Sequence, residues 1–131
     1  MSMLVEVSTG EYLDKISILQ IKAKRIIDPQ KLQHVQKELA ALMKEWKGAP
    51  ILESKIAAEF KQLRAVNEKL WELEDRIREK EAEMNFDAEF IDIARAVYIT
   101  NDHRAEIKRT INIKLESAFL EVKSYAGHTA R

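Results

Sequence analysis

Residues 56–84 read IAAEFKQLRAVNEKLWELEDRIREKEAEM, and this stretch decides the fold. Its apolar residues recur at heptad spacing, at Ile56, Leu63, Leu70 and Ile77, with Val66 and Leu73 at the intervening positions. Such a repeat over about three heptads is typical of a helix that packs along one side against another helix. Neither Gly nor Pro interrupts it. We therefore predict a long helix from near Leu52 to about Met84.

A second long helix is expected after a break at residues 85–87, where Asp87 is a predicted N-cap. Residues 88–126 contain neither Gly nor Pro. A helix over 88–124 would be roughly 55 Å long, whereas a domain of this size is only about 36 Å across. Two alternatives follow. Either this helix breaks near Thr100, or the third and fourth helices form a long antiparallel hairpin that protrudes and is covered by a second subunit.

Two shorter helices are predicted before this pair. Ser8 and Glu11 match a capping box, in which the hydroxyl accepts from one backbone amide and the carboxylate reaches back to another. The first helix is expected from about residue 10 to 27. Asp28, followed by a proline, predicts the start of the next helix, which is expected to end near residue 46.

The composition agrees with few, long elements. The chain has 131 residues, of which 46% are apolar and 34% charged, with only 3 Gly and 2 Pro. This length fits one domain with a hydrophobic core of its own. We predict an all-α single domain over residues 1–131 with about four helices. Residues 1–8 are expected to form a short extended arm, and residues 124–131 a frayed tail.

The charge balance and the missing residue types argue against several classes of protein. Lys and Arg number 22, as do Asp and Glu, and no segment supplies the basic surface that nucleic-acid binding needs. The absence of cysteine excludes disulfides and thiolate metal sites. No apolar run approaches the ~20 residues of a membrane span, and no signal-like N-terminal segment is present. We expect a cytoplasmic protein without a membrane or nucleic-acid partner.

Motifs of the common catalytic classes are also missing. The sequence has no Gly-rich phosphate loop, no nucleophile elbow and no HExxH zinc motif. His34, His103 and His128 have no partner at metal-ligand spacing. We therefore expect no cofactor and no metal, and the catalytic residues of any reaction stay unknown.

Three of the predicted helices carry polar or aromatic residues every three or four positions, so each set lies on one face of its helix. We call these sets the polar seam. Its candidate ligand-binding residues are Glu11, Lys15, Lys22, Arg25, Trp71, Glu74, Arg78, Tyr98, Asn101, Arg104, Lys108 and Asn112. Arg104 and Lys108 are the most informative, because they interrupt an apolar stripe defined by Val97 and Ile111. Charges on a core-facing stripe are costly unless they have partners.

Two structural interpretations of the seam need no ligand. If the fourth helix rotates, or breaks near Thr100, the charges form a solvated face. Alternatively, they form an internal ion network that fixes the register of the helices, with Glu74 and Glu81 facing Arg104 and Lys108.

The functional interpretation is a pocket for a small anionic ligand. Trp71 and Tyr98 would supply its aromatic walls. The ligand would be held by four cations, namely Lys22, Arg25, Arg104 and Lys108. All three interpretations remain open from the sequence.

Three sequence blocks carry a resemblance to a known family. They are Gly10-Glu11-x-x-Asp14-Lys15-x-x-Ile18-Leu19-x-Ile21-Lys22, Trp71-x-x-Glu74-Asp75-x-x-Arg78-x-x-Glu81, and Ala94-Arg95-x-Val97-Tyr98-x-x-Asn101-Asp102-x-Arg104-x-x-x-Lys108-x-x-Ile111-Asn112. With them the chain resembles, over nearly its whole length, a family of short bacterial all-helical proteins of unknown function. The resemblance implies an association with glycosyltransferases or envelope-polysaccharide proteins, to which relatives are sometimes attached or near which they are encoded. It implies no activity.

A shorter likeness, over about twenty residues, is to the all-helical chorismate mutases. Leu13-Asp14-Lys15-x-x-x-Leu19, followed by Lys22 and Arg25, is similar to the first helix of those enzymes, whose pocket clamps a dicarboxylate with Arg and Lys. The arginine that they place early in this helix is missing, because Glu11-Tyr12 stand there.

From these observations we expect a small helical accessory or ligand-binding module, and the family resemblance implies a role in envelope-glycan synthesis. It is expected to be a homodimer, with a small anionic ligand or a glycosyltransferase-type protein as partner. One alternative is an enzyme with a chorismate-mutase-like pocket for a small anionic metabolite. The other is a structural helical hairpin that docks a partner.

Overall fold

Five helices make up the part of the protein that the computed structural model describes, namely residues 1–46, 48 and 50–116. They are α1 (Thr9–Arg25), α2 (Pro29–Lys44), α3 (Pro50–Lys55), α4 (Ala57–Ala82) and α5 (Ala88–Lys114). Helix accounts for 80% of the described residues, and none of these residues is in a strand. The prediction of an all-α fold is confirmed for this part of the chain. The predicted tail at 124–131 lies outside it.

The helices begin where the capping residues of the sequence indicate. The Ser8 hydroxyl accepts from the Glu11 backbone amide at 3.1 Å. The Asp28 carboxylate accepts from the first amides of α2, and the Asp87 carboxylate accepts from the Phe90 amide at the start of α5. Each cap satisfies an amide that has no partner inside the helix. The second half of the predicted capping box is different, because the Glu11 carboxylate turns to Lys108.

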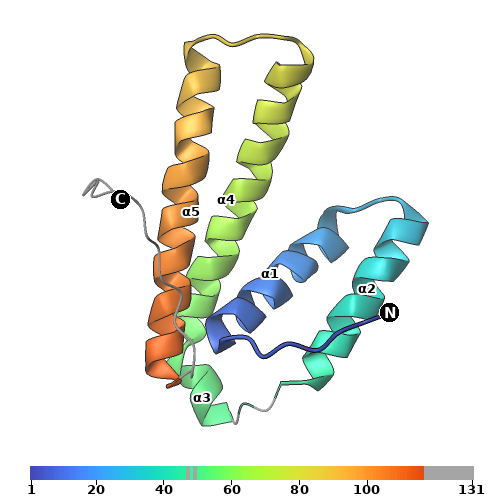
Figure 1. Ribbon diagram of the computed structural model, residues 1–131, viewed down its shortest axis with the longest axis vertical. Helices are drawn as coiled ribbons and strands as arrows, with labels where there is room; N and C mark the ends of the chain where they lie inside the picture. Colours follow the sequence, from blue (N-terminus) through green and yellow to red (C-terminus); the bar gives the residue numbers. More distant parts are fainter. Residues whose placement is uncertain (47, 49, 117–131) are drawn as a thin grey trace.

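The long helices α4 and α5 lie side by side and are joined by residues 83–87 (Figure 1). Helix α1 packs across the lower part of this pair and contacts both members. Helix α2 packs chiefly on α1, and none of its residues is buried. The molecule therefore has one three-helix junction, at which α1 meets α4 and α5.

The hydrophobic core lies at this junction. It consists of Leu13 from α1, Ile56, Leu63, Val66 and Leu70 from the heptad stretch, and Ile107 and Ile111 from α5. Ile77, the last residue of the heptad repeat, is only partly buried. The ends of α4 and α5 next to the turn at 83–87 extend beyond α1 (Figure 1). The heptad pattern thus identified the core-facing side of the helix.

Three predicted boundaries are wrong. The helix expected over 52–84 begins at Pro50 and is divided at Ile56, where the backbone leaves helical geometry and the side chain enters the core. The first helix ends at Arg25, so that Ile27 is exposed. Helix α5 ends at Lys114 instead of near residue 124, because Glu116 adopts a positive φ of 53°, which a continuing helix does not allow.

Helix α5 runs through Thr100 without a break. The alternative in which the fourth helix is interrupted there is therefore wrong. Residues before and after Thr100 keep the same helical phase, and Arg104 and Lys108 consequently face the same neighbours as Val97 and Ile111. None of the helices in the described residues has both the length and the apolar character to cross a membrane.

Candidate ligand-binding cleft

Asp14 is the centre of a buried polar cluster that includes Arg104 and Lys108 of the polar seam. Its side chain projects from α1 toward α5 and is 1% exposed. The Arg104 guanidinium grips it with two nitrogens, with Nε at 3.0 and 3.1 Å from the two carboxylate oxygens and Nη2 donating to Oδ2. Lys108 Nζ lies 3.7 Å from Oδ2. A bidentate arginine–carboxylate pair is among the strongest polar contacts in proteins and fixes the orientation of both groups.

Helix α4 contributes an amide to the same cluster. Asn67 Nδ2 donates to Asp14 Oδ1 at 2.8 Å and to Ser17 Oγ at 2.7 Å. Ser17 Oγ in turn donates to the Asp14 carbonyl oxygen. Asn67 and Ser17 are both buried. The carboxylate of Asp14 is therefore held from α4 and α5 at once, and its position is fixed.

A second set of contacts joins α1 to α5, about one helical turn before Asp14 on α1. Lys108 Nζ donates to Glu11 Oε2 at 2.5 Å, and the Gly10 backbone amide donates to Asn112 Oδ1 at 2.6 Å. A Cβ atom at Gly10 would lie 2.5 Å from the Lys108 carbonyl oxygen. Glycine is required at this position because the two helices approach backbone to backbone.

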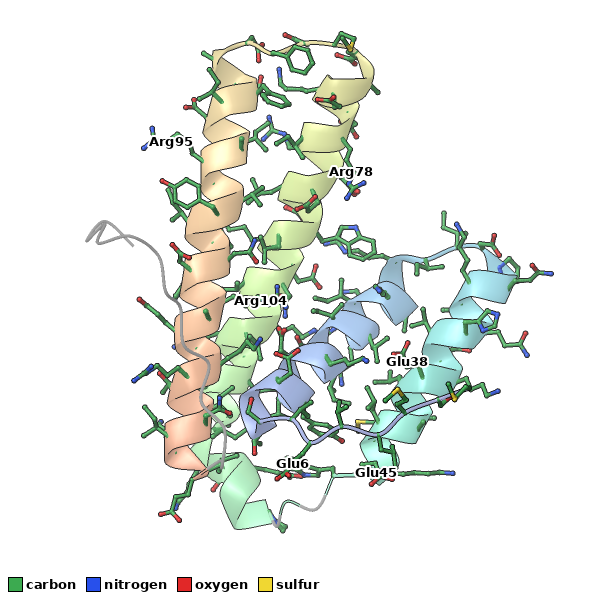
Figure 2. All side chains as sticks on the ribbon, viewed as in Figure 1. Glu6, Glu38, Glu45, Arg78, Arg95 and Arg104 are labelled. Carbon is green, nitrogen blue, oxygen red and sulfur yellow. The ribbon has the colours of Figure 1, made fainter. Side chains whose placement is uncertain are left out.

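Next to this cluster, an open cleft of about 390 Å³ lies between α1, α4 and α5. Figure 2 shows the Arg104 side chain at the place where the paired helices meet α1. Its lining combines apolar, aromatic, amide and charged side chains. The lining residues are Ile18, Ile21, Asn67, Leu70, Trp71, Glu74, Asp75, Asn101 and Arg104.

Four of the candidate residues from the sequence line this cleft: Trp71, Glu74, Asn101 and Arg104. Asn101 Oδ1 accepts from Arg104 Nη1 at 3.3 Å, so the two side chains from α5 form one wall. Glu11 and Lys108 belong to the adjoining ion cluster. The spacing of three and four residues thus brought six of the twelve candidates to one region of the fold.

The cations predicted to hold an anion are mostly paired with carboxylates. Arg104 and Lys108 contact Asp14 and Glu11. Arg25 pairs with Glu68 and, at 3.4 Å, with Glu72, while its guanidinium lies 5.8 Å from the centre of the Trp71 ring. The hydrogen bond from Arg25 lowers the pKa of the Glu68 carboxyl below its ordinary value. Lys22, which is partly buried, makes no ion pair within the described part of the chain and does not line the cleft.

The remaining candidates lie elsewhere. Lys15 forms an exposed pair with Glu38 at 3.4 Å. Arg78 is 77% exposed and reaches back to Glu74 at 3.5 Å, on the solvent side of α4 (Figure 2). Tyr98 is exposed and lines no part of the cleft. Asn112 is fully buried against Gly10 and acts in helix packing.

The structural interpretations of the seam are also resolved. Lys108 is 5% exposed, so the solvated-face interpretation is wrong for this residue. An internal ion network does exist, but its predicted partners were wrong. Asp14 and Glu11 from α1 contact Arg104 and Lys108, whereas Glu81 is exposed and Glu74 pairs with Arg78.

Sequence reasoning missed three residues of the site as candidates. Asp14 was recognised only as part of a motif. As a single carboxylate on an otherwise apolar face, it could have been identified as the partner of a buried cation. Asn67 belongs to the polar set on its helix and lies one turn before Trp71. Asp75 appeared only within the quoted block that begins at Trp71 and was not singled out as a candidate. Among the described residues, no group of three or more His, Asp or Glu side chains is placed to hold a metal ion.

Comparisons with known proteins give a family without an assigned activity. No curated protein and no solved structure matches this chain. Residues 3–130 match the profile of a family of unknown function, DUF6165, and because the match covers nearly the whole chain, this protein belongs to that family.

Proposed function

We propose that this protein is a small helical accessory module that binds a small ligand in the cleft between α1, α4 and α5. The cleft itself carries the proposal. Sites for small molecules are concave spaces of roughly 300–1,000 Å³, largely apolar, with a few polar groups that converge on the ligand. The cleft has this size, apolar lining residues in Ile18, Ile21 and Leu70, and polar groups from Asn101 and Arg104.

The way the walls are held supports the same proposal. Arg104 is fixed by Asp14, and Asn67 is fixed by Asp14 and Ser17, all through buried contacts between different helices. Side chains that are already oriented lose little entropy when a ligand binds, which favours affinity. A purely structural ion pair would need no open space beside it.

The proposal is tested by thermal-shift screening against anionic metabolites, organic amines, neutral sugars and sugar nucleotides. A compound that binds in the cleft should raise the melting temperature of the wild-type protein. Trp71→Leu should remove this shift, because Trp71 lines the cleft. Tyr98→Leu is the matched control, since Tyr98 is an exposed aromatic residue outside the cleft, and should keep it. A panel without any shift, or a shift that Trp71→Leu leaves intact, would contradict the proposal.

The place of such a module in the cell is a further part of the proposal. Service in the synthesis of bacterial envelope glycans, with a glycosyltransferase-type partner, rests on the family resemblance, and a shift with sugar nucleotides would support it. The alternative of a mutase-like enzyme for an anionic metabolite requires free cations. It is less favoured, because Arg104, Lys108 and Arg25 are paired with carboxylates. Chemical turnover of a bound compound would support the enzyme alternative.

A docking role is a second candidate, favoured by one observation. On the side of α5 away from the core, four apolar residues are exposed: Ile91, Tyr98, Ile99 and Ile113. Isolated apolar residues are common at protein surfaces, but a stripe along one helix is typical of contact with a partner. In this candidate function, α4 and α5 act together as a hairpin that presents this stripe.

A further inference from the structure

We infer that the cleft is selective for an organic cation, meaning a ligand with an ammonium group on an apolar or aromatic body. This inference rests on the proposed function and names the class of ligand. It reverses the expectation from the sequence, in which the cations of the polar seam hold an anion. The argument has three parts: the charge of the cleft, an acceptor in its wall, and its aromatic surface.

The charged groups that line the cleft are predominantly acidic. Glu74 and Asp75 contribute two carboxylates, and Arg104 contributes one guanidinium. The positive charge of Arg104 is already offset by Asp14, which lies directly behind it and is buried. Arg78 contacts Glu74 only at an exposed position, where the pairing is weak. An anion in the cleft would therefore meet uncompensated negative charge, whereas an ammonium group would be attracted to it.

Asn67 provides an independent indication of a hydrogen-bond donor on the ligand. This side chain is 5% exposed and lines the cleft. Both hydrogens of its amide nitrogen are used, one on Asp14 and one on Ser17, which fixes the orientation of the group. Its amide oxygen accepts no hydrogen bond from any residue that the structure describes. Because Asn67 lines the cleft, this acceptor can take a hydrogen bond from a ligand, and an ammonium group carries up to three donors.

Trp71 supplies the third part. An indole ring attracts cations to its face. This ring already does so within the protein, since the Arg25 guanidinium lies 5.8 Å from its centre, held there by Glu68 and Glu72. Trp71 lines the cleft and Arg25 does not, so a ligand in the cleft can contact Trp71 without displacing Arg25. The apolar body of the ligand would lie against Ile18 and Ile21.

Three probes of nearly equal shape and different charge test the inference: 2-phenylethylammonium, 2-phenylethanol and 3-phenylpropanoate. Binding of each to the full chain is measured by isothermal titration calorimetry at neutral pH and low salt. The ammonium compound should bind at least about tenfold more tightly than the alcohol, as expected when one charge-assisted hydrogen bond is added. The carboxylate should bind most weakly.

Variants then assign the effect to the cleft. Asp75→Asn and Glu74→Gln each remove one carboxylate from the wall and should weaken binding of 2-phenylethylammonium by about tenfold. Glu79→Gln is the matched control, because it makes the same change on an exposed residue of the same helix outside the cleft, and should bind like the wild type. Circular dichroism of each variant checks that the fold is kept.

The outcomes separate this inference from the function on which it rests. Preference for the ammonium probe that is lost in Asp75→Asn or Glu74→Gln, but kept in Glu79→Gln, supports both. Tighter binding of 3-phenylpropanoate, or equal binding of all three probes in a manner that depends on Trp71, overturns the cation selectivity and leaves a ligand site. No binding of any probe, together with an empty thermal-shift screen, overturns both.

Discussion

Asp14 joins three helices through a single side chain. It accepts from Arg104 on α5 and from Asn67 on α4, and it is almost inaccessible to solvent. A carboxylate in such a place is tolerated because Arg104 and Asn67 donate hydrogen bonds to it and Lys108 Nζ lies 3.7 Å away. If Asp14 is removed, Arg104 loses its main compensating charge, and the buried Lys108 retains only Glu11.

We therefore predict that Asp14→Asn lowers the free energy of unfolding by about 3 kcal/mol or more, since removal of one partner from a buried ion pair leaves the other charge uncompensated. Urea denaturation at neutral pH measures this. Asp75→Asn makes the same chemical change on an exposed carboxylate and should alter the stability by less than about 0.5 kcal/mol. Equal stabilities of the two variants would show that the Asp14 cluster does not hold the helices together.

At the scale of whole elements, Asp87 connects the two helices of the turn between α4 and α5. Its carboxylate accepts hydrogen bonds from the Phe90 amide of α5 and from Lys80 of α4. These two hydrogen bonds lower the pKa of the Asp87 carboxyl below its ordinary value of 3.8. The larger effect comes from the Phe90 backbone amide and the smaller from Lys80. Because the carboxyl is more acidic in the folded protein, its ionised form stabilises the fold above the unfolded-state pKa. This contribution is lost as the pH falls through the folded-state pKa.

Asp87→Asn keeps a capping oxygen but removes the titrating group. We predict that the wild type melts at a higher temperature than this variant at neutral pH, and that the difference disappears on acidification to roughly pH 2. Thermal denaturation followed across this range measures it. Lys80→Gln should remove only part of the difference, because the Phe90 amide is the larger contribution. A difference that stays constant with pH would contradict this account of the turn.

For the molecule as a whole, the uneven distribution of apolar surface is the main feature. Helix α2 has no buried residue, and the outward side of α5 exposes Ile91, Tyr98, Ile99 and Ile113. Apolar residues that precede α1, such as Leu4 and Val5, are exposed as well. Surfaces of this kind are often covered in a symmetric dimer, in which the same patch is used by both subunits.

The homodimer therefore stays a prediction with a direct test. Sedimentation velocity at tens of micromolar should show a dimer for the wild-type protein. Ile99→Asp should shift it toward monomer if α5 forms the interface, because a carboxylate would be desolvated there. His103→Asp, which places the same charge on an exposed polar residue of α5 one turn later, serves as a control. A monomeric wild type would remove the dimer and leave the α5 stripe for another partner.

The sequence by itself determined the helical class of the fold, the starts of α1, α2 and α5, and the core-facing side of α4. Capping residues such as Ser8, Asp28 and Asp87 are local signals, because the amides they satisfy lie two or three residues away. The heptad residues Leu63 and Leu70 identified the core-facing side of α4, because helical periodicity depends only on spacing along the chain.

Only the tertiary structure decided the pairing of charges. Arg104 pairs with Asp14, which is ninety residues away in the sequence. Helical periodicity does not predict which carboxylate on one helix lies opposite which cation on another. For the same reason the break at Ile56 could not be predicted: nothing in its neighbours ends a helix, and the backbone bends because the side chain enters a core assembled by other elements. The cleft, too, exists only where α1 crosses α4 and α5. Its set of lining residues therefore follows from that crossing, not from any one helix.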